Sequence, residues 1–128
     1  MAVARDTGLI VGQAVSLDRG LETLQAVADT LPPAQRYASD GHAAYSEVLW
    51  PEGGQHVLSV GKEETHTIES VNANLRTYLK RLARRQRCFS RSLDALRRAV
   101  RLFVYHYNRR QRLYLAHPSY RGCLPLLF

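Results

Sequence analysis

Two carboxylates, Asp40 and Glu69, stand where the sequence pattern allows metal-dependent chemistry on phosphodiesters. Asp40 follows a strand expected at residues 35–39, and Glu69 lies near the start of a long helix expected from about residue 65. Ligands of open α/β sheets bind beyond the carboxyl ends of the strands. Because residues 41–68 suffice for a short helix and a strand, both carboxylates can converge on one end of the sheet. Such a pair can hold divalent ions, Mg²⁺ or Mn²⁺, which activate the attacking oxygen and stabilise the leaving oxygen.

Each carboxylate also has a purely structural interpretation. Asp40 and Gly41 form a common turn pair. Glu69 can pair with a cation on its own helix, where Asn72 and Arg76 share its face at offsets of three and seven. The alternative for Glu69 is a metal ligand or general base that surrounding arginines keep anionic. The combination of the two carboxylates is more specific for metal-dependent chemistry than either one alone.

The elements that must position Asp40 alternate strand and helix through the first half of the chain. Runs of β-branched residues mark the strands, leucines at helical spacing mark a helix, and Pro and Gly mark the breaks. Val3 and Ala4 end a first strand, and Asp6-Thr7-Gly8 has the chemistry of a hairpin turn. The further expected elements are a strand at 9–17, a helix at 18–31 with Asp18 as N-cap and Pro32 as its stop, a strand at 35–39, a short helix at 42–49 and a strand at 56–60.

Long helices are expected in the second half of the chain. Apolar side chains at helical spacing predict one helix from about Thr65 to Arg87. A second helix, capped by Ser90 or Ser92, is expected to run to about Asn108. The two helices can form an antiparallel hairpin. The tail that follows is basic and aromatic, and its prolines and glycine exclude long regular elements.

The net charge of +7 is distributed unevenly. Residues 1–64 carry four basic and nine acidic side chains, whereas residues 65–128 carry 14 basic and two acidic ones. A surface of one sign repels itself unless a partner relieves it, so the second half is a candidate for binding nucleic acid rather than a merely solvated face. Arginine, which suits bidentate phosphate contacts, supplies nearly all of this charge. The expected DNA-binding residues are Lys80, Arg81, Arg84, Arg85, Arg87 and Arg91.

Composition excludes several other classes of protein. The hydrophobic content of 45% and charged content of 23% are ordinary for a globular chain. No apolar run is long enough to span a membrane, and no signal peptide is recognisable, so we predict a cytoplasmic location. Cys88 and Cys123 are too few for a disulfide framework or a complete zinc site.

Aromatic side chains and histidines have mainly structural interpretations. The five histidines show no metal-binding spacing, although His66 could approach Glu69. Tyr107 fits the apolar stripe of the second helix, and Trp50 is expected to anchor the packing at a helix end. Tyr114 and Tyr120, which lie among arginines, are candidates for stacking on bases.

Two blocks of the sequence resemble a known family. The block SDGHAAY at residues 39–45 is followed by GKEETHTIESVNANLRTYLKRLARRQRCFSRSLDALRRAV at residues 61–100. Together they resemble the catalytic C-terminal region of insertion-sequence-one family transposases. The ESVNANLR stretch, the basic segment after it and the Phe-Ser pair are the most recognisable parts. The resemblance runs from about residue 6 to residue 108.

The resemblance implies a ribonuclease-H-like fold with a DDE active site and Mg²⁺-dependent cutting and joining of DNA. By position, Asp40 matches the second acidic residue of that site and Glu69 the third. Asn72, Asn74 and Arg76 match polar residues of the motif around the glutamate, where they would support the site. The implied partners are the insertion-sequence ends and the target DNA.

The expected fold class is α/β, an incomplete ribonuclease-H-like sheet followed by a long basic helical hairpin. Residues 1–64 would form the partial sheet and its helices, residues 65–110 the long helices that complete the catalytic domain, and residues 111–128 a basic, aromatic tail. The family's first catalytic Asp lies in an Asp-Glu-x-Trp motif upstream of the hairpin, which these residues do not contain. Asp6, in the hairpin turn, and Asp18, at a helix start, do not replace it.

Two functions follow as hypotheses. The first is a transposase catalytic fragment that lacks activity alone and needs the first Asp from a longer chain, a translational fusion or a partner. Because the missing strand would leave apolar edges exposed, this hypothesis also predicts low stability or self-association. The second is a non-catalytic basic module that binds nucleic acid through its helical hairpin and tail.

Overall fold

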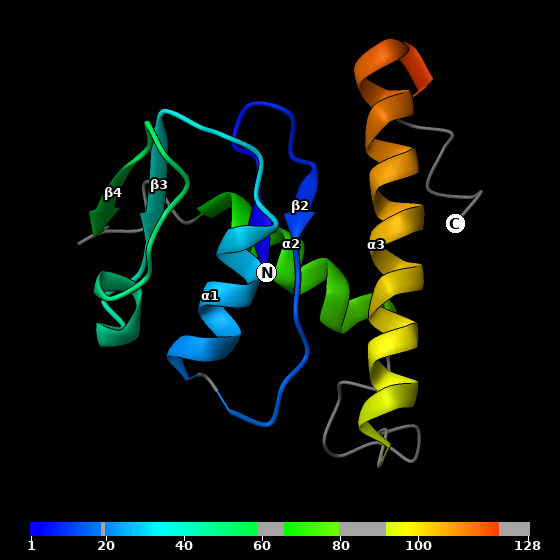
Figure 1. Ribbon diagram of the computed structural model, residues 1–128. Helices are drawn as coiled ribbons and strands as arrows, with labels where there is room; N and C mark the ends of the chain where they lie inside the picture. Colours follow the sequence, from blue (N-terminus) through cyan, green and yellow to red (C-terminus); the bar gives the residue numbers. More distant parts are fainter. Residues whose placement is uncertain (19, 59–65, 80–91, 121–128) are drawn as a thin grey trace.

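A computed structural model describes residues 1–18, 20–58, 66–79 and 92–120 (Figure 1). The described residues form a mixed α/β structure with three α-helices and two small sheets. The strands are β1 (Ala2–Val3), β2 (Ile10–Gly12), β3 (Arg36–Ser39) and β4 (Gln55–Leu58). The helices are α1 (Leu21–Asp29), α2 (His66–Tyr78), α3 (Leu93–Ala116) and two 3₁₀ turns, η1 (Ala43–Ser46) and η3 (Pro118–Tyr120).

The N-terminal hairpin forms as the sequence predicts, but its second strand is short. β1 and β2 pair antiparallel, with Val3 opposite Ile10. Gly8 turns the chain with φ of +70°, a conformation that glycine adopts without the steric cost of a Cβ. Strand structure ends at Gly12 instead of reaching residue 17, since β1 offers only two residues as pairing partners.

The prediction that Asp18 is the N-cap of α1 is wrong. Gly20, in an extended conformation, is the N-cap residue and provides no side-chain cap. The Asp18 carboxylate accepts a hydrogen bond from the Gly20 amide at 2.9 Å, so it stabilises the turn that leads into the helix. The end of α1 follows the prediction, because the helix stops at Asp29, ahead of Pro32.

β3 and β4 form a parallel pair. Tyr37 lies opposite His56, and Ser39 lies opposite Leu58. Between them the chain forms η1, a 3₁₀ turn within the segment where a short helix is expected. Parallel strands leave a sheet at the same edge, so the chain departs from β3 and from β4 on the same side.

The main core joins the hairpin to the two long helices. Ile10 of β2, Val71 of α2, and Phe103 and Tyr107 of α3 form one buried cluster. The Asn108 amide reinforces this contact, because its Oδ1 accepts from the Ile10 amide and its Nδ2 donates to the Ile10 carbonyl, each at 2.8 Å. α3 is thereby fixed against the hairpin by both apolar and polar contacts.

α3 corrects two expectations for the second half. Ser92 caps it by accepting from the Ala95 amide, as one of the two expected caps, but the helix continues beyond Asn108 to Ala116. The segment after Asn108 contains no Pro or Gly until Pro118, so nothing in it stops the helix. In Figure 1, α2 runs across the view toward α3 instead of alongside it, so the described parts of the two helices do not form the expected antiparallel hairpin.

The two sheets are separate within the described residues. β1 and β2 form one, β3 and β4 the other, and α1 lies between them in Figure 1. The strands and helices of the expected α/β fold are therefore present. The expected single incomplete sheet is not formed by the described residues. No helix in the described ranges is both long and apolar enough to cross a membrane.

Candidate functional site

Asp40 follows directly after β3, where the parallel pair ends. Its carboxylate is exposed, and Oδ1 accepts a hydrogen bond from the His42 amide at 3.2 Å. This local bond orients the carboxylate and leaves the second oxygen available to a ligand. The short turn to η1 then carries the chain away, with the His42 imidazole accepting from the Ala44 amide.

A polar chain beneath Asp40 was not foreseen from the sequence. Ser39 is 7% exposed, and its hydroxyl donates to the Asp40 carbonyl at 3.2 Å. The Nε2 atom of His56 lies 2.7 Å from the same hydroxyl oxygen. Which of the two groups donates in this contact depends on the imidazole tautomer. His56 thus fixes the hydroxyl that holds the backbone of Asp40.

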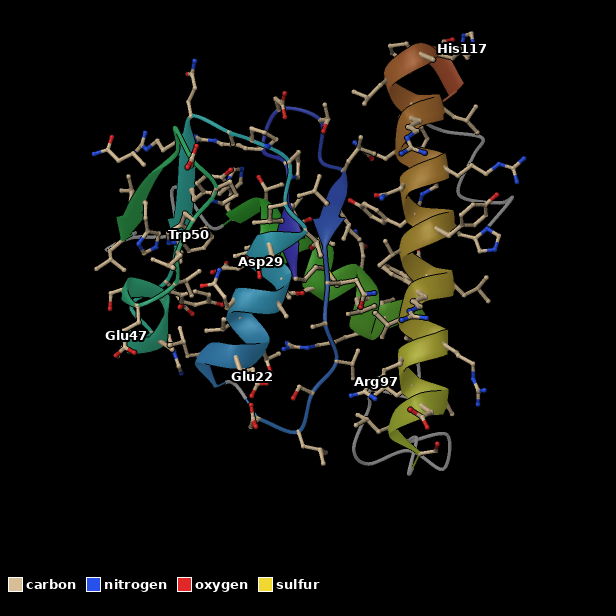
Figure 2. All side chains as sticks on the ribbon, viewed as in Figure 1. Glu22, Asp29, Glu47, Trp50, Arg97 and His117 are labelled. Atoms are coloured by element: carbon tan, nitrogen blue, oxygen red, sulfur yellow. The ribbon has the colours of Figure 1, made fainter. Side chains whose placement is uncertain are left out.

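Aromatic stacking holds His56 in place. Its ring stacks on Trp50 with 4.8 Å between centroids, and Trp50 stacks on Tyr37 at 5.1 Å. Burial lowers the pKa of His56, because the charged imidazolium loses solvation. Figure 2 shows Trp50 beside β3 and β4, in the packing role expected for it.

Glu69 lies in the first turn of α2, and its side chain is exposed. The N-terminal end of a helix favours a negative charge because of the helix dipole. Asn72 is half-buried and Arg76 is exposed on the same helix, three and seven residues after Glu69. The three side chains share a face by spacing, but no hydrogen bond or ion pair within the described ranges joins them to one another or to Asp40.

The topology relates the two carboxylates without placing them in contact. Asp40 leaves the sheet from β3, and the chain that leaves from β4 at the same edge leads, through residues 59–65, to α2 and Glu69. The described residues contain no group of three or more His, Cys, Asp or Glu side chains that could hold a metal ion. Two exposed carboxylates nonetheless fit Mg²⁺, which commonly keeps several waters and binds one or two protein carboxylates together with substrate phosphates.

A comparison with known protein families identifies the family of this chain. Residues 2–114 match the family described as IS1 transposase. The chain belongs to the IS1 transposase family. The resemblance carried by the two sequence blocks is thereby confirmed, and the match extends beyond residues 6–108 at both ends. No curated protein and no solved structure matches the chain.

The IS1 transposase match covers both candidate metal ligands. It runs from β1 into the last turn of α3 and includes both Asp40 and Glu69. Family membership indicates a transposase-type function and a DNA partner. The six basic residues expected to bind DNA between positions 80 and 91 lie outside the described residues.

For His56, the sequence contains one weak signal. His56 starts the run HVLSV, where a polar residue occupies a strand otherwise rich in apolar side chains. In the parallel register, Leu58 lies opposite Ser39, and His56 lies two positions before Leu58 on the same face of the sheet. Without the register, His56 is indistinguishable from an exposed strand residue.

Proposed function

We propose that this chain carries the region of a transposase that performs metal-dependent DNA cleavage and strand transfer, with Asp40 and Glu69 as the metal-binding carboxylates. The observation that carries the proposal is the parallel β3–β4 pair, which sends the segments bearing the two carboxylates out of the same edge. Family membership supplies the reaction class.

Mg²⁺ or Mn²⁺, held by Asp40 and Glu69, would supply activation of the attacking oxygen and stabilisation of the leaving oxygen. The chain's own residues orient these ligands. Ser39 and the His42 amide fix the backbone and the carboxylate of Asp40, and Glu69 lies in the first turn of α2, where the helix dipole favours a negative charge. Asn72 and Arg76 support the site from the same face of α2, where Arg76 can contact a phosphate of the bound strand.

A third carboxylate is needed for the complete site that the family resemblance implies. Asp6 accepts from the Thr7 amide and Asp18 from the Gly20 amide, each at 2.9 Å, so both serve local turns. We therefore assign neither to the site. In this proposal, strand transfer requires an Asp from a longer chain, a fusion or a partner, and the 128 residues alone bind the metal ion without transferring strands.

Calorimetric titration with Mn²⁺ tests the ligand assignment. Asp40→Asn and Glu69→Gln should each weaken binding at least tenfold, because each removes one of two anionic ligands. Glu22→Gln is the matched control, because Glu22 is likewise exposed in the first turn of a helix (Figure 2). Asp6→Asn controls for loss of a turn-forming aspartate. Equal effects of the control and site variants would refute the assignment.

The second candidate is a non-catalytic module that binds nucleic acid, which the exposed arginines of α3 favour. It predicts that the variant with both Asp40→Asn and Glu69→Gln keeps its salt-dependent affinity for DNA, and that the wild-type chain shows no specific Mn²⁺ site. A Mn²⁺ site lost in both single variants excludes this candidate as the whole function.

A further inference from the structure

One face of α3 carries arginines at a regular helical interval. Arg98, Arg101, Arg109 and Arg112, with Tyr105 at the centre, follow one another at spacings of three and four residues. All five side chains are exposed, and Tyr105 is 61% exposed. At about 100° per residue they lie opposite the buried side of the helix. We call these five residues the α3 arginine stripe.

The buried side of α3 is a separate surface. Val100, Phe103 and Tyr107 pack into the core. Arg110 lies over the rings of Tyr78 and Tyr107, with its guanidinium carbon 6.0 and 5.7 Å from their centroids. Arg110 therefore packs against the protein, in contrast to the arginines of the stripe.

Charge on the stripe is not compensated by the helix itself. Asp94, in the first turn of α3, pairs with Arg97 at 3.3 Å. The Arg97 Nε atom also donates to the Val15 carbonyl, which ties this arginine to the segment after β2 (Figure 2). None of the four stripe arginines is paired with an acidic side chain in the ranges that the structure covers. Four positive charges in one row, without an acidic partner among the described residues, repel one another unless a polyanion lies along them.

The dimensions of the stripe suit a duplex backbone. The distance along the helix from Arg98 to Arg112 is about 21 Å at a rise of 1.5 Å per residue. That length corresponds to about six base pairs at 3.4 Å each. The guanidinium groups can each contact a phosphate in bidentate fashion, and the Tyr105 hydroxyl can donate to a phosphate between them. Contacts of this kind, made to phosphates, position a protein on the duplex and carry no sequence information directly.

We propose that the α3 arginine stripe is a binding surface for the phosphate backbone of double-stranded DNA, outside the carboxylate site. The proposal rests on the proposed function only in taking DNA as the partner. It requires neither Asp40 nor Glu69, so the two proposals can fail independently.

Fluorescence anisotropy with a 30-base-pair duplex of arbitrary sequence tests the stripe in the full 128-residue chain. Replacing its four arginines by glutamine should weaken binding about ten- to a hundredfold at low salt and reduce the slope of log affinity against log salt by about 3 to 4. The matched controls are Arg5→Gln with Arg36→Gln, because both residues are exposed and lie on other elements. This double control should change the slope by less than one unit. A quadruple Arg→Lys variant should restore most of the slope, which separates loss of charge from loss of folding.

Three results would overturn the proposal. The first is an unchanged salt slope in the quadruple glutamine variant that circular dichroism shows to be folded. The second is a loss of slope per removed charge in the Arg5 and Arg36 control equal to that in the quadruple variant, which would show that only total charge matters. The third is displacement of the duplex by polyglutamate at equal charge concentration, which would identify the stripe as a surface for acidic polypeptides. Retained duplex binding in the variant with Asp40→Asn and Glu69→Gln is the expected result, and it holds whether or not the carboxylates bind metal.

Discussion

The Nε2 atom of His56 lies 2.7 Å from the hydroxyl oxygen of Ser39, the last residue of β3. Ser39 in turn donates to the carbonyl of Asp40. A histidine on one strand thus determines, through a buried hydroxyl on its neighbour, how the chain turns at the candidate metal ligand. The same contact links the stability of the parallel pair to the geometry of the site.

Removing the Ser39 hydroxyl should destabilise the protein. Ser39→Ala deletes the bond to Asp40 and removes the hydrogen-bond partner of the His56 Nε2 atom, so we expect unfolding to become easier by about 1–2 kcal/mol. Urea denaturation measures the change. Ser46→Ala is the control, since the exposed Ser46 hydroxyl bonds only to the Ala43 carbonyl within its own turn. A loss below about 0.5 kcal/mol, which is the usual scatter of surface substitutions, would contradict the role of Ser39.

His56 should make stability depend on pH. Burial lowers its pKa below the value of 6.5 that it has when the chain unfolds. As the pH falls, the unfolded chain therefore takes up a proton at His56 before the folded chain does. The folded protein has its full stability with respect to His56 above pH 6.5, and this stability decreases as the pH falls from there toward the lowered pKa. Urea denaturation of wild type and His56→Gln over that range should show a shallower pH dependence in the variant. Parallel pH profiles would be incompatible with a buried neutral imidazole.

Asn108 should be the most sensitive polar residue of α3. Its amide satisfies both backbone groups of Ile10 across the main core, at 2.8 Å each. Asn108→Ala leaves both groups without these partners, and we expect a loss of about 2 kcal/mol. Thermal unfolding monitored by circular dichroism measures it. Leu115→Ala on the same helix, at a side chain 47% exposed, should have little effect. Similar unfolding midpoints for the two variants would show that Asn108 does not hold the hairpin.

Gly54 is required by close packing. A Cβ at this position would collide with the Tyr37 ring and lie 2.8 Å from the Ala34 carbonyl oxygen. Gly54→Ala should therefore cost about 1–3 kcal/mol in urea denaturation. At Gly41 an added Cβ meets nothing within 4 Å, so Gly41→Ala is the control. A Gly54→Ala protein as stable as the Gly41→Ala protein would show that the Tyr37 ring moves aside freely.

The order of elements was predictable because hydrophobic period and Gly or Pro breaks are local properties of the chain. Pairing depends on partners far along the chain, which explains the errors. The strand expected at 9–17 ends at Gly12, because only β1 pairs with it. Asp18 has the side chain of a helix cap, but it bonds to the Gly20 amide ahead of the helix.

The length of α3 illustrates how composition can mislead. The prolines and glycine beyond residue 117 favoured an irregular tail after Asn108, yet the arginines and tyrosines that directly follow Asn108 support the helix by contacts one turn apart. Arg110 lies over the rings of Tyr107 and Tyr114, with 5.9 Å from its guanidinium carbon to the Tyr114 centroid. Such pairs at three and four residues stabilise helices. Tyr107 was correctly expected in the core.

The two carboxylates of the candidate site could be predicted from the sequence. The contacts that hold Asp40 in place could not. A carboxylate after a strand and another at a helix start are visible in the sequence, and the parallel β3–β4 pair agrees with their common edge. The contact between Ser39 and His56 depends on the register of two strands and on a stack through Trp50. Neither can be derived from spacing along one chain.

Iron-directed cleavage of the protein backbone tests most directly whether Asp40 and Glu69 bind one metal site. Fe²⁺ bound in place of Mg²⁺ generates hydroxyl radicals under ascorbate and peroxide, and these cut the backbone next to the ligands. Mass spectrometry of the fragments should show paired cuts near residues 40 and 69 that excess Mg²⁺ suppresses and that both disappear in Asp40→Asn. Cuts near only one of the two residues, or cuts that persist in Asp40→Asn, would contradict the shared site.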